Sequence, residues 1–540
     1  MAFVSSTGVG VAGLRRPAGR TLPPSLRRPG RCATATGRVR MVSAPPAPFP
    51  SSPVVDPPVP GTVALVALGC AKNTVDAEVL LADIDATPGL TVIDDPATAD
   101  CVIVNTCAFV EDAKRASVEA ILAAAALQAD SPRRSALVVT GCMAQRYAGE
   151  LAAALPEVDA VVGFENYAGL PAKIGALLTV ARSDREDAAS TAADVAVGAP
   201  TVPFRPEWRR KRLTPRHSAY LRVAEGCNNN CSFCVIPSFR GAFRSKPFDA
   251  LMEEVRVLVE AGVVEFNIIG EDTNQYGMDF GLADRRRLED VIRAIASYPQ
   301  VVFIRLLYTY PTVWGWSDAL VDTLAETSKV ACYIDMPLQH ISQDILTAMN
   351  RPPAAYTRKL LAKLRARLPG VTLRSTFISG FPGETDAHHR ELVRFVNEQR
   401  FSRCGVFIYS TEEGTAAAVL PGAVDPQVAT ARRDELVALQ QDIQAEAAEA
   451  AVGSVLDVLV DRIQGGGAVG RSSADAPDID GVVHVLQPAA PGTVVRVKVV
   501  GCNGFDLIGD ANPEVVAAAD LSARLEREAA GGEEVTAGGK

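Results

Sequence analysis

Three cysteines within eight residues constrain this chain more than any other stretch. They are Cys227, Cys231 and Cys234, with three and then two residues between them. Three soft thiolates at such spacing can bind one face of an iron–sulfur cube. A complete cube has four ligands, so one iron stays open to a ligand that is not protein. The sequence therefore predicts a cofactor site here, and the fold must bring the three thiols to one point.

A zinc knuckle is the alternative for this stretch. Structural zinc sites usually have four ligands in two close pairs. No second close pair follows, and the nearest histidine, His217, lies ahead of the first cysteine. With the aromatic Phe233 before its last cysteine, the run CxxxCxxC resembles the radical-SAM superfamily. That resemblance implies a 4Fe-4S cluster with S-adenosylmethionine (SAM) at its open iron, and a cofactor contact at Phe233.

A second set of cysteines follows three predicted strands nearer the N-terminus. The apolar runs 63–68, 101–104 and 137–140 are typical of buried parallel strands. Spacings of 37 and 35 residues place one cysteine after each strand. Ligands bind at the carboxyl edge of open parallel sheets, so the sequence predicts a second three-thiolate site with an open iron. Its cysteines are Cys70, Cys107 and Cys142.

Small residues in tight turns are the alternative reading of these three positions, because cysteine is a common buried residue. Their recurrence at three strand ends favours the metal site. Cys101 lies inside its own strand and is expected to be a core residue only.

Residues 216–440 alternate apolar runs with helical patterns. Six strand–helix units of this kind indicate a parallel barrel or partial barrel. The stretch that begins at Cys227 follows the first strand, so its site also lies at the C-terminal ends of strands, where barrel chemistry sits. The runs are 219–224, 264–269, 301–308, 331–337, 372–379 and 404–409, with helical patterns at 248–261, 314–326, 356–368 and 385–399.

The whole chain is predicted to be an α/β protein that ends in a small antiparallel β-barrel. Alternating residues separated by Gly and Pro turns predict that barrel, and a helix at about 426–450 leads into it. The predicted segments are a leader at 1–60, a parallel α/β domain at 61–180, a linker at 181–215, the barrel core at 216–440, the terminal β-barrel at 441–512 and a frayed tail at 513–540.

The first 60 residues hold eight Arg, no Lys and one acidic residue, Asp56. This composition predicts an organelle transit peptide, for the chloroplast or alternatively the mitochondrion, and a disordered extension is the third reading. The chain carries a net charge of −9, so residues 61–540 carry −16. An acidic enzyme fits a basic protein partner better than broad phosphate contact. No apolar run of about 18 residues is present, so no membrane span is expected.

The order of these parts resembles the methylthiotransferase family over residues 61–510, and the terminal barrel resembles its TRAM domain. One branch of the family modifies adenosines in tRNA. The other modifies an aspartate of small-subunit ribosomal protein number twelve. The motifs that carry the resemblance are 68–73 (LGCAKN), 105–107, 141–143, 225–234, 236–237, 240–241, 335–340 (DMPLQH), 380–385 (GFPGET), 409–410 and 412–415.

Two short segments are similar to the protein-modifying branch, namely 470–481 (GRSSADAPDIDG) and 506–509 (DLIG). In residues 451–512, seven acidic residues outnumber four basic ones, which fits a basic ribosomal protein better than a phosphate chain. Ordinary solvated surface is the alternative for these acids.

The resemblance implies two 4Fe-4S clusters, SAM, and transfer of a methylthio group to the β-carbon of the aspartate. Radical chemistry of this kind belongs to cofactors. It also implies an electron donor such as ferredoxin, and we expect a monomer. SAM contacts are expected at Gly270 and Glu271, which keep part of a Gly-Gly-Glu run, and at Gly380, whose loop is otherwise a turn. The rival functions are a tRNA adenosine methylthiotransferase and a non-catalytic iron–sulfur or RNA-binding module.

Overall fold

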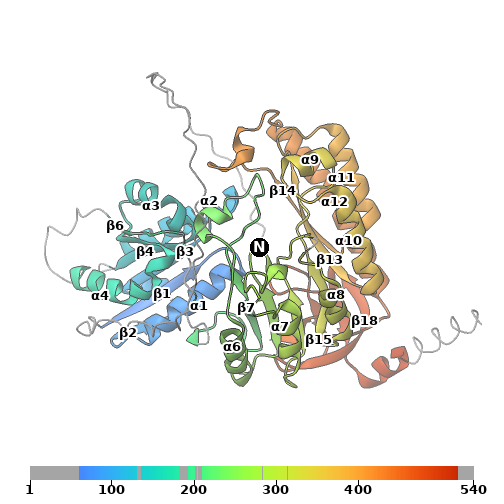
Figure 1. The fold of residues 1–540 in the computed structure, drawn as a ribbon. Helices are drawn as coiled ribbons and strands as arrows, with labels where there is room; N and C mark the ends of the chain where they lie inside the picture. The colour runs from blue at the N-terminus through green and yellow to red at the C-terminus, as the bar shows by residue number, and fades with distance from the viewer. Residues whose placement is uncertain are drawn as a thin grey trace, which may run out of the picture. The chain divides into compact units, whose positions relative to one another are not determined.

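The computed structural model describes residues 60–129, 135–181, 193–200, 204, 209–282, 284–312 and 314–520. These residues form two parallel sheets, a closed barrel and a short two-stranded ribbon (Figure 1). The predicted α/β fold class is thereby confirmed. No helix in the described ranges is both long enough and apolar enough to span a membrane. The predicted transit peptide lies outside the described residues, apart from Pro60.

The N-terminal sheet has six parallel strands in the order β2-β1-β3-β4-β5-β6. The three strands expected from the sequence are confirmed as β1, β3 and β4. The other three were not predicted, because three residues are too few to show a periodic pattern. The bounds are β1 Gly61–Ala67, β2 Leu90–Val92, β3 Cys101–Thr106, β4 Ala136–Gly141, β5 Ala160–Val162 and β6 Asp194–Ala196.

Strand β6 corrects the predicted linker. It lies within 181–215, yet it pairs in parallel with β5, with Asp194 opposite Ala160. It is an edge strand whose side chains are largely exposed, so it carries no buried apolar run that a sequence pattern could show. The N-terminal sheet therefore continues to Ala196.

Two glycines set the turns that present cysteines at the edge of this sheet. Gly69 and Gly141 have φ of 95° and 92°, a left-handed conformation that glycine adopts readily. A Cβ atom at Gly141 would lie 2.4 Å from the carbonyl oxygen of Thr106, so no larger residue fits. Helices start directly after these turns. They are α1 Ala71–Asp85 and α3 Cys142–Ala154. The other helices of this domain are α2 Glu111–Ala129 and α4 Leu170–Ala181.

The second sheet is open, with six parallel strands in the order β14-β13-β12-β11-β10-β7. All six expected strands are confirmed. Among the described residues its edge strands β14 and β7 do not pair, so the barrel is partial. The bounds are β7 Ser218–Arg222, β10 Glu265–Ile269, β11 Phe303–Leu306, β12 Val330–Asp335, β13 Thr372–Ser379 and β14 Arg403–Ile408.

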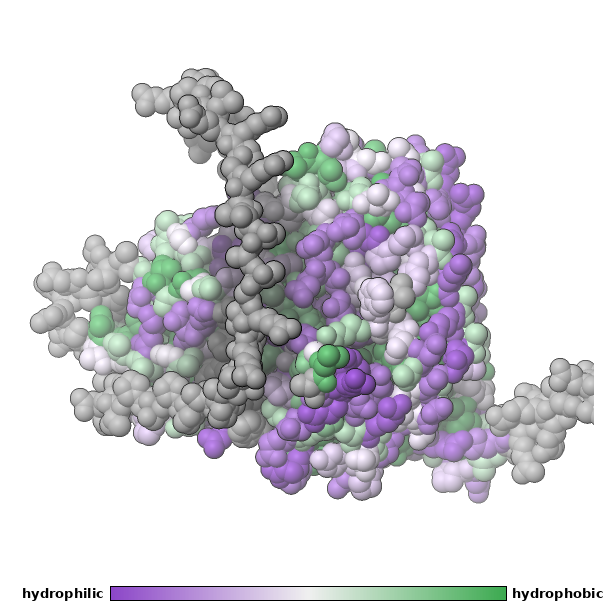
Figure 2. All heavy atoms as spheres, viewed as in Figure 1, coloured by the Kyte–Doolittle hydropathy of each residue, from purple (hydrophilic) through white to green (hydrophobic). Residues whose placement is uncertain are grey.

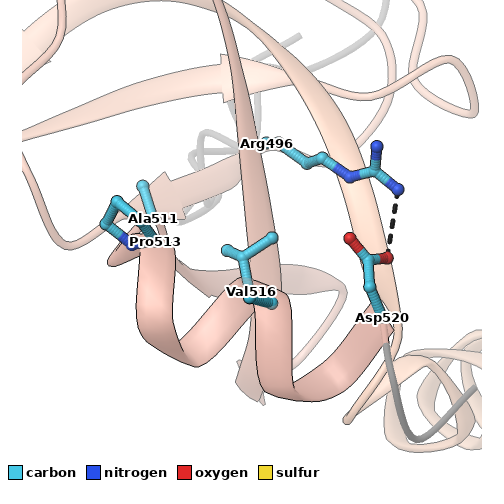
Figure 3. A pocket seen from close by; sticks show the side chains of 6 residues that line it. Arg496, Ala511, Pro513, Val516 and Asp520 are labelled. Carbon is cyan, nitrogen blue, oxygen red and sulfur yellow. Dashed lines mark hydrogen bonds and ion pairs between the residues drawn. The ribbon is translucent and has the colours of Figure 1, made fainter.

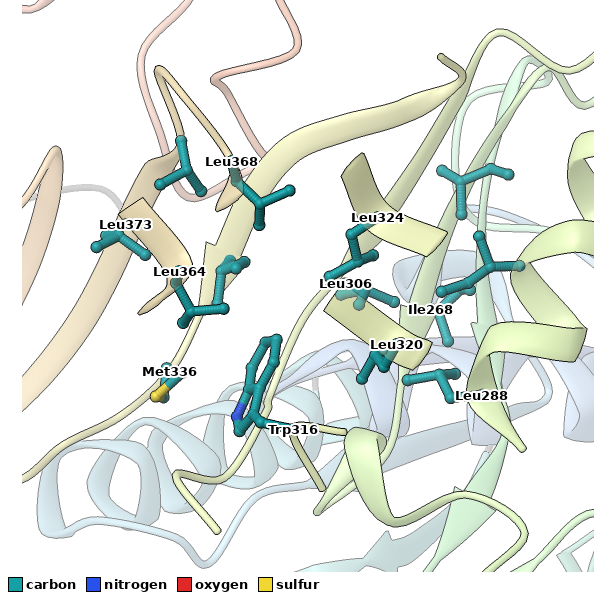
Figure 4. Packing of buried hydrophobic residues seen from close by; sticks show 14 of the residues in the cluster. Ile268, Leu288, Leu306, Trp316, Leu320, Leu324, Met336, Leu364, Leu368 and Leu373 are labelled. Atoms are coloured by element: carbon teal, nitrogen blue, oxygen red, sulfur yellow. The ribbon is translucent and has the colours of Figure 1, made fainter. Parts of the chain in front are cut away.

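Helices cover one face of this second sheet. Leu288 and Leu320 point from their helices toward Ile268 and Leu306 of the strands (Figure 4). Each fully buried leucine contributes about 2 kcal/mol through removal of apolar surface from water. The expected helices are confirmed as α6, α8, α10 and α11, whereas α7 and α9 were not predicted. The bounds are α6 Phe248–Glu260, α7 Leu288–Ala296, α8 Asp318–Glu326, α9 Gln343–Ala348, α10 Ala354–Arg367 and α11 Asp386–Gln399.

The C-terminal strands close into a barrel in the order β15-β16-β17-β19-β18, as the sequence predicted. One pair, β17 with β19, runs in parallel instead of antiparallel. The reason is that β18 crosses to pair with β15, and the hairpin from β18 then returns β19 beside β17. Helix α12 (Pro426–Ala451) leads into the barrel as expected. The strands are β15 Val455–Gln464, β16 Gly467–Arg471, β17 Val483–Val485, β18 Val494–Asn503 and β19 Asp506–Asp510.

The predicted frayed tail begins instead as a helix over 513–520. Asn512 explains its start, because its Oδ1 atom accepts a hydrogen bond from the amide of Glu514 at 3.0 Å. The helix borders a small surface pocket, where Arg496 of β18 pairs with Asp520 at 3.1 Å (Figure 3). None of the predicted cofactor residues lines this pocket. The outer face over α10 and α11 carries mostly hydrophilic side chains, as expected of helices that bury one side only (Figure 2).

Candidate active site

Cys227, Cys231 and Cys234 lie in a loop between β8 (Ala224–Glu225) and α5 (Ile236–Arg240), beyond the carboxyl end of β7. Asn229 donates hydrogen bonds from its backbone and side-chain nitrogens to the Sγ atom of Cys227, both at 3.4 Å. Arg351 donates from Nη1 to the Sγ atom of Cys231 at 3.6 Å. Donors around sulfur stabilise the thiolate form that binds metal.

Burial raises the pKa of Cys227 and of Cys234 to about 12, although backbone hydrogen bonds act in the opposite direction. Thiols in such a site ionise when a metal supplies positive charge. The three thiols and their donors therefore fit an iron–sulfur cluster. Neither Asn229 nor Arg351 stood out in the sequence, and Arg351 lies 120 residues from the thiol it contacts.

The second set of cysteines meets at the carboxyl edge of the N-terminal sheet. Cys70 precedes α1, Cys107 follows β3, and Cys142 begins α3. Asn73 ties their loops together, because its Nδ2 atom donates to the carbonyl oxygens of Leu68 at 3.0 Å and Thr106 at 2.8 Å. Asn73 is fully buried in the first turn of α1. The position of an asparagine at the start of a predicted helix, three residues after Cys70, is a signal that sequence inspection could have used.

These three thiols share one electrostatic environment. Burial raises the pKa of Cys142 to about 12; the Arg240 guanidinium lowers it, and Cys70 and Cys107 raise it further. Among the described residues, no three His, Cys, Asp or Glu side chains lie close enough to bind a single metal ion. A cluster needs no such approach, because each thiolate binds a different iron. All six metal-ligand assignments remain predictions. Cys101 is fully buried in β3, as expected of a core residue.

A buried charge network connects the two sheets. Arg240 pairs with Asp76 of α1 at 2.8 Å, and Arg222 pairs with the same carboxylate at 2.6 Å. Burial, followed by Arg222, dominates the environment of Glu225, and the net effect raises its pKa to about 8. Each of these four side chains is at most 4% exposed. The network fixes the first turns of α1 against the loop that carries Cys227.

A cavity lies beside Cys234 and is lined in part by residues that follow Cys107 in the chain. Phe109 and Val110, directly beyond Cys107, line it together with Phe233 and Cys234. Of the six predicted metal ligands, Cys234 lines this cavity, and Cys70, Cys107 and Cys142 are not among its lining residues. The remaining lining residues are Val235, Gln339, Thr376, Ile378, Phe407, Ile408, Tyr409, Ser410 and Glu412.

The predicted SAM contacts fall in different surroundings. Phe233 lines the cavity. Glu271, directly after β10 and Gly270, has a buried Oε2 atom with no hydrogen-bond partner among the described residues. Such an orphaned carboxylate oxygen fits the amino group of SAM. Gly380 instead donates its amide to Glu384 at 2.6 Å, and a Cβ atom there would lie 2.5 Å from Cβ of Ala429. Its SAM contact remains a prediction, and its visible role is in a turn.

Three protein-family models match successive parts of the chain. The uncharacterized protein family UPF0004 matches residues 62–163, the radical SAM superfamily matches 221–396, and the TRAM domain matches 452–511. The three ranges fall in the N-terminal sheet, the partial barrel and the closed barrel, although the first ends before β6 and the second before β14.

Curated relatives cover almost the whole described chain. The ribosomal protein uS12 methylthiotransferase RimO of Geotalea uraniireducens (strain Rf4) is 42% identical over 456 residues, which are 84% of this chain and 98% of its own. This chain belongs to the RimO family. The RimO of Synechococcus sp. (strain CC9902) is 39% identical over 467 residues, 85% of this chain and 96% of its own. Membership makes the chain a radical-SAM methylthiotransferase and implies SAM and iron–sulfur clusters.

In this RimO-family chain, segment 470–481 is an internal anchor. Arg471 donates two hydrogen bonds to the buried carboxylate of Glu265 in β10, at 2.8 and 2.7 Å. Arg305 of β11 donates to the carbonyl oxygen of Ser473 at 2.6 Å. The segment therefore fastens the terminal barrel to strands of the second sheet.

The anchor overturns the charge argument made for the barrel. Asp475 pairs with Arg403 at 2.8 Å, and Asp480 accepts a hydrogen bond from Tyr333 at 2.6 Å. Their side chains are 7% and 1% exposed, and Asp461 pairs with Arg471. These acids neutralise cations of their own chain and are not free to attract a basic protein. The other charged residues of 451–512 are Asp457, Asp478, Asp506 and Asp510 against Arg462, Lys498 and Arg496, of which Arg496 pairs with Asp520.

Proposed function

We propose that this chain transfers a methylthio group to the β-carbon of an aspartate in ribosomal protein uS12, inside the chloroplast. The relatives that share about 40% of its residues carry the name of uS12 methylthiotransferase. The observation that carries the proposal is the single cavity that borders Cys234 on one side and the residues after Cys107 on the other. The loop of Cys234 and the residues that follow Cys107 thus meet at one space that a substrate side chain could enter.

The residues present fit two clusters and SAM. When bound, these groups supply one-electron cleavage of SAM, hydrogen abstraction and sulfur, which no side chain offers. Cys227, Cys231 and Cys234 would hold the cluster that binds SAM. The second cluster would be held by Cys70, Cys107 and Cys142.

The chain's own groups position and shield the reaction. The free Oε2 atom of Glu271 would accept a hydrogen bond from the SAM amino group. Arg351 and Asn229 stabilise the thiolates next to it. The apolar walls of the cavity, which include Phe233, would hold the reacting groups in place and limit side reactions. An external one-electron donor is needed, and a ferredoxin fits a plastid.

The proposed location rests on the first 60 residues. Their eight arginines and single acidic residue are typical of a transit peptide. Fusion of residues 1–60 to a fluorescent protein tests this directly. Signal in chloroplasts supports the proposal, and signal in mitochondria moves the same reaction to the other organelle.

Mass spectrometry of organellar uS12, with and without the gene, tests the reaction. The expected result is a methylthio mass on the aspartate peptide that disappears without the gene. Nucleoside analysis of tRNA from the same cells is the companion measurement. Loss of methylthio-adenosine with an unchanged uS12 peptide would overturn the proposal in favour of the tRNA reaction.

A further inference from the structure

Lys72 is a buried cation that lies close to acidic groups without forming an ion pair with any described one: burial lowers its pKa, but Cys70, Tyr308 and Glu271 raise it above the usual value. It lies in the first turn of α1, two residues beyond Cys70, and is 8% exposed. Its Nζ atom lies 3.2 Å from the centroid of the Tyr308 ring. Within the described part of the chain, its ammonium forms no ion pair and no hydrogen bond. An ammonium has three donors and is costly to bury without acceptors, because an aromatic face attracts the charge but accepts no ordinary hydrogen bond.

The surroundings hold this ammonium in place. Ala71 and Val75, on either side of Lys72 in α1, pack in a buried cluster with Ile269 and Leu307 at the carboxyl ends of β10 and β11. The lysine therefore projects between the cysteine edge of the N-terminal sheet and the open end of the partial barrel.

Tyr308 is held in a strained conformation that aims its ring at the lysine. Its φ is 60°, a left-handed value that bulky residues rarely adopt. Its amide donates to Oδ2 of Asp335 at 3.0 Å, and Arg374 pairs with Oδ1 of the same carboxylate at 2.7 Å. Strain of this kind persists where the surroundings enforce it, and it concentrates at functional sites.

We propose that Lys72 binds the carboxylate of the substrate aspartate and selects this side chain. The inference rests on the proposed function, because it assumes that the target is an aspartate. In that residue the β-carbon is bonded directly to the carboxyl carbon. An ammonium that fixes the carboxylate thus fixes the carbon that must lose a hydrogen and gain sulfur. The neighbouring Cys70 places the bound carboxylate next to the predicted sulfur-donating site.

Other cations nearby already have partners. Arg240 is paired with Asp76 and lies near Glu225. The free oxygen of Glu271 suits an amine, and its carboxylate lies near enough to Lys72 to raise the pKa of the lysine. Arg351 donates to Cys231 and to the carbonyl oxygen of Pro337. Among the described cations next to the second cysteine set, the ammonium of Lys72 therefore keeps donors for a further acceptor.

The test measures binding of two synthetic peptides to the reconstituted full chain. They span the target region of uS12 and carry either aspartate or asparagine at the modified position. The variants are Lys72→Met, Lys72→Arg and, as a matched control, Lys359→Met, which replaces an exposed lysine of α10. A charge-assisted contact predicts that the wild type binds the aspartate peptide about tenfold or more tighter. Lys72→Met should abolish this preference, Lys72→Arg should keep much of it, and the control should keep all of it.

Three results would overturn the inference. The first is a Lys72→Met variant that retains the wild-type preference for aspartate. The second is loss of SAM affinity in that variant with the peptide preference intact, which would assign the ammonium to the cofactor. In both cases a wild type that still modifies the peptide leaves the proposed function standing. The third is a wild type that modifies neither peptide, which overturns the proposed function and the inference together. Thermal unfolding of Lys72→Met and Lys72→Arg verifies that each is folded.

Discussion

Arg240 donates a hydrogen bond from Nη2 to the Sγ atom of Cys142 at 3.5 Å, although Arg240 ends α5 and Cys142 begins α3, 98 residues earlier. The same guanidinium donates to Oδ1 of Asn73 at 2.7 Å and pairs with Asp76. Arg240 thus stabilises Cys142, a predicted metal ligand at the edge of the N-terminal sheet, and Asn73, which connects the loops around it.

Substitution Arg240→Gln should lower both stability and iron content. Removing one partner of a buried ion pair costs about 3–5 kcal/mol, because Asp76 would stay buried with less compensation. We expect urea unfolding at lower denaturant and less iron bound per chain. Arg240→Lys should retain part of both. Unchanged iron content in a folded Arg240→Gln chain would exclude a role at Cys142.

Substitution Glu412→Gln should loosen the wall of the cavity. Glu412 pairs with Arg146 at 2.7 Å and with Lys114 at 3.1 Å, so it connects the end of the second sheet to α2 and α3. Its side chain is 4% exposed. We expect a loss of about 2–4 kcal/mol in the free energy of unfolding. The matched control is Glu413→Gln, whose side chain is exposed and should change stability by less than about 0.5 kcal/mol.

The buried carboxylate of Glu265 should make the free energy of unfolding depend on pH in the acid range. Burial alone would raise the pKa of Glu265, but Arg471, followed by Arg305 and Ser218, lowers it to about 2. Because the folded-state pKa is below the unfolded value of 4.5, the stabilisation is complete above that pH and is lost as pH falls toward 2. A shift of this size corresponds to about 3 kcal/mol. The free-energy difference between wild type and Glu265→Gln should therefore be large at pH 7 and shrink near pH 3; a constant difference would contradict the ion-pair explanation.

Substitution Asp475→Asn should destabilise the chain without weakening attraction to a basic partner. Asp475 pairs with Arg403 and accepts a hydrogen bond from the Ser472 hydroxyl at 2.6 Å. We expect a loss of about 3–5 kcal/mol. Asp457→Asn, at an exposed position of β15, is the control and should be neutral for stability. Neither substitution should change how the affinity for a uS12 peptide depends on salt concentration.

The cysteine assignments predict a clear contrast in metal content. Cys142→Ala should lower the iron and sulfide bound per chain, because it removes a ligand at the sheet edge. Cys101→Ala should leave both unchanged, since its side chain is packed inside β3. Iron loss in Cys101→Ala at unaltered thermal stability would show that the ligand set is wrong.

The fold was predictable where information is local. A continuous apolar run indicates a buried strand, and a glycine followed by cysteine marks its end, so the turns at Gly69 and Gly141 with their thiols could be expected from the sequence. The three-residue strands β2, β5 and β6 were missed because so short a segment has no period. The left-handed conformation of Tyr308 was also unpredictable, because it depends on Asp335, 27 residues later.

The charged contacts of the site could not be predicted for the same reason. Asp76 and Arg222 are 146 residues apart, and nothing in the pattern around either one indicates its partner. The sequence predicts that the acidic residues of the barrel favour a basic protein partner, with solvated surface as the alternative, because composition counts charges without showing which way they point. Asp480 belongs to a different class of acid, one that is buried and hydrogen-bonded.

The inward direction of segment 470–481 has a consequence for protein engineering. A terminal barrel exchanged between two members of the wider family would bring its own anchor to a foreign sheet. Arg471 would then lie opposite a different residue in place of Glu265. Its two buried hydrogen bonds would lose their acceptor. Chimeras that fold should therefore be those that transfer Glu265 and Arg305 together with the barrel, because these two residues bind its anchor segment.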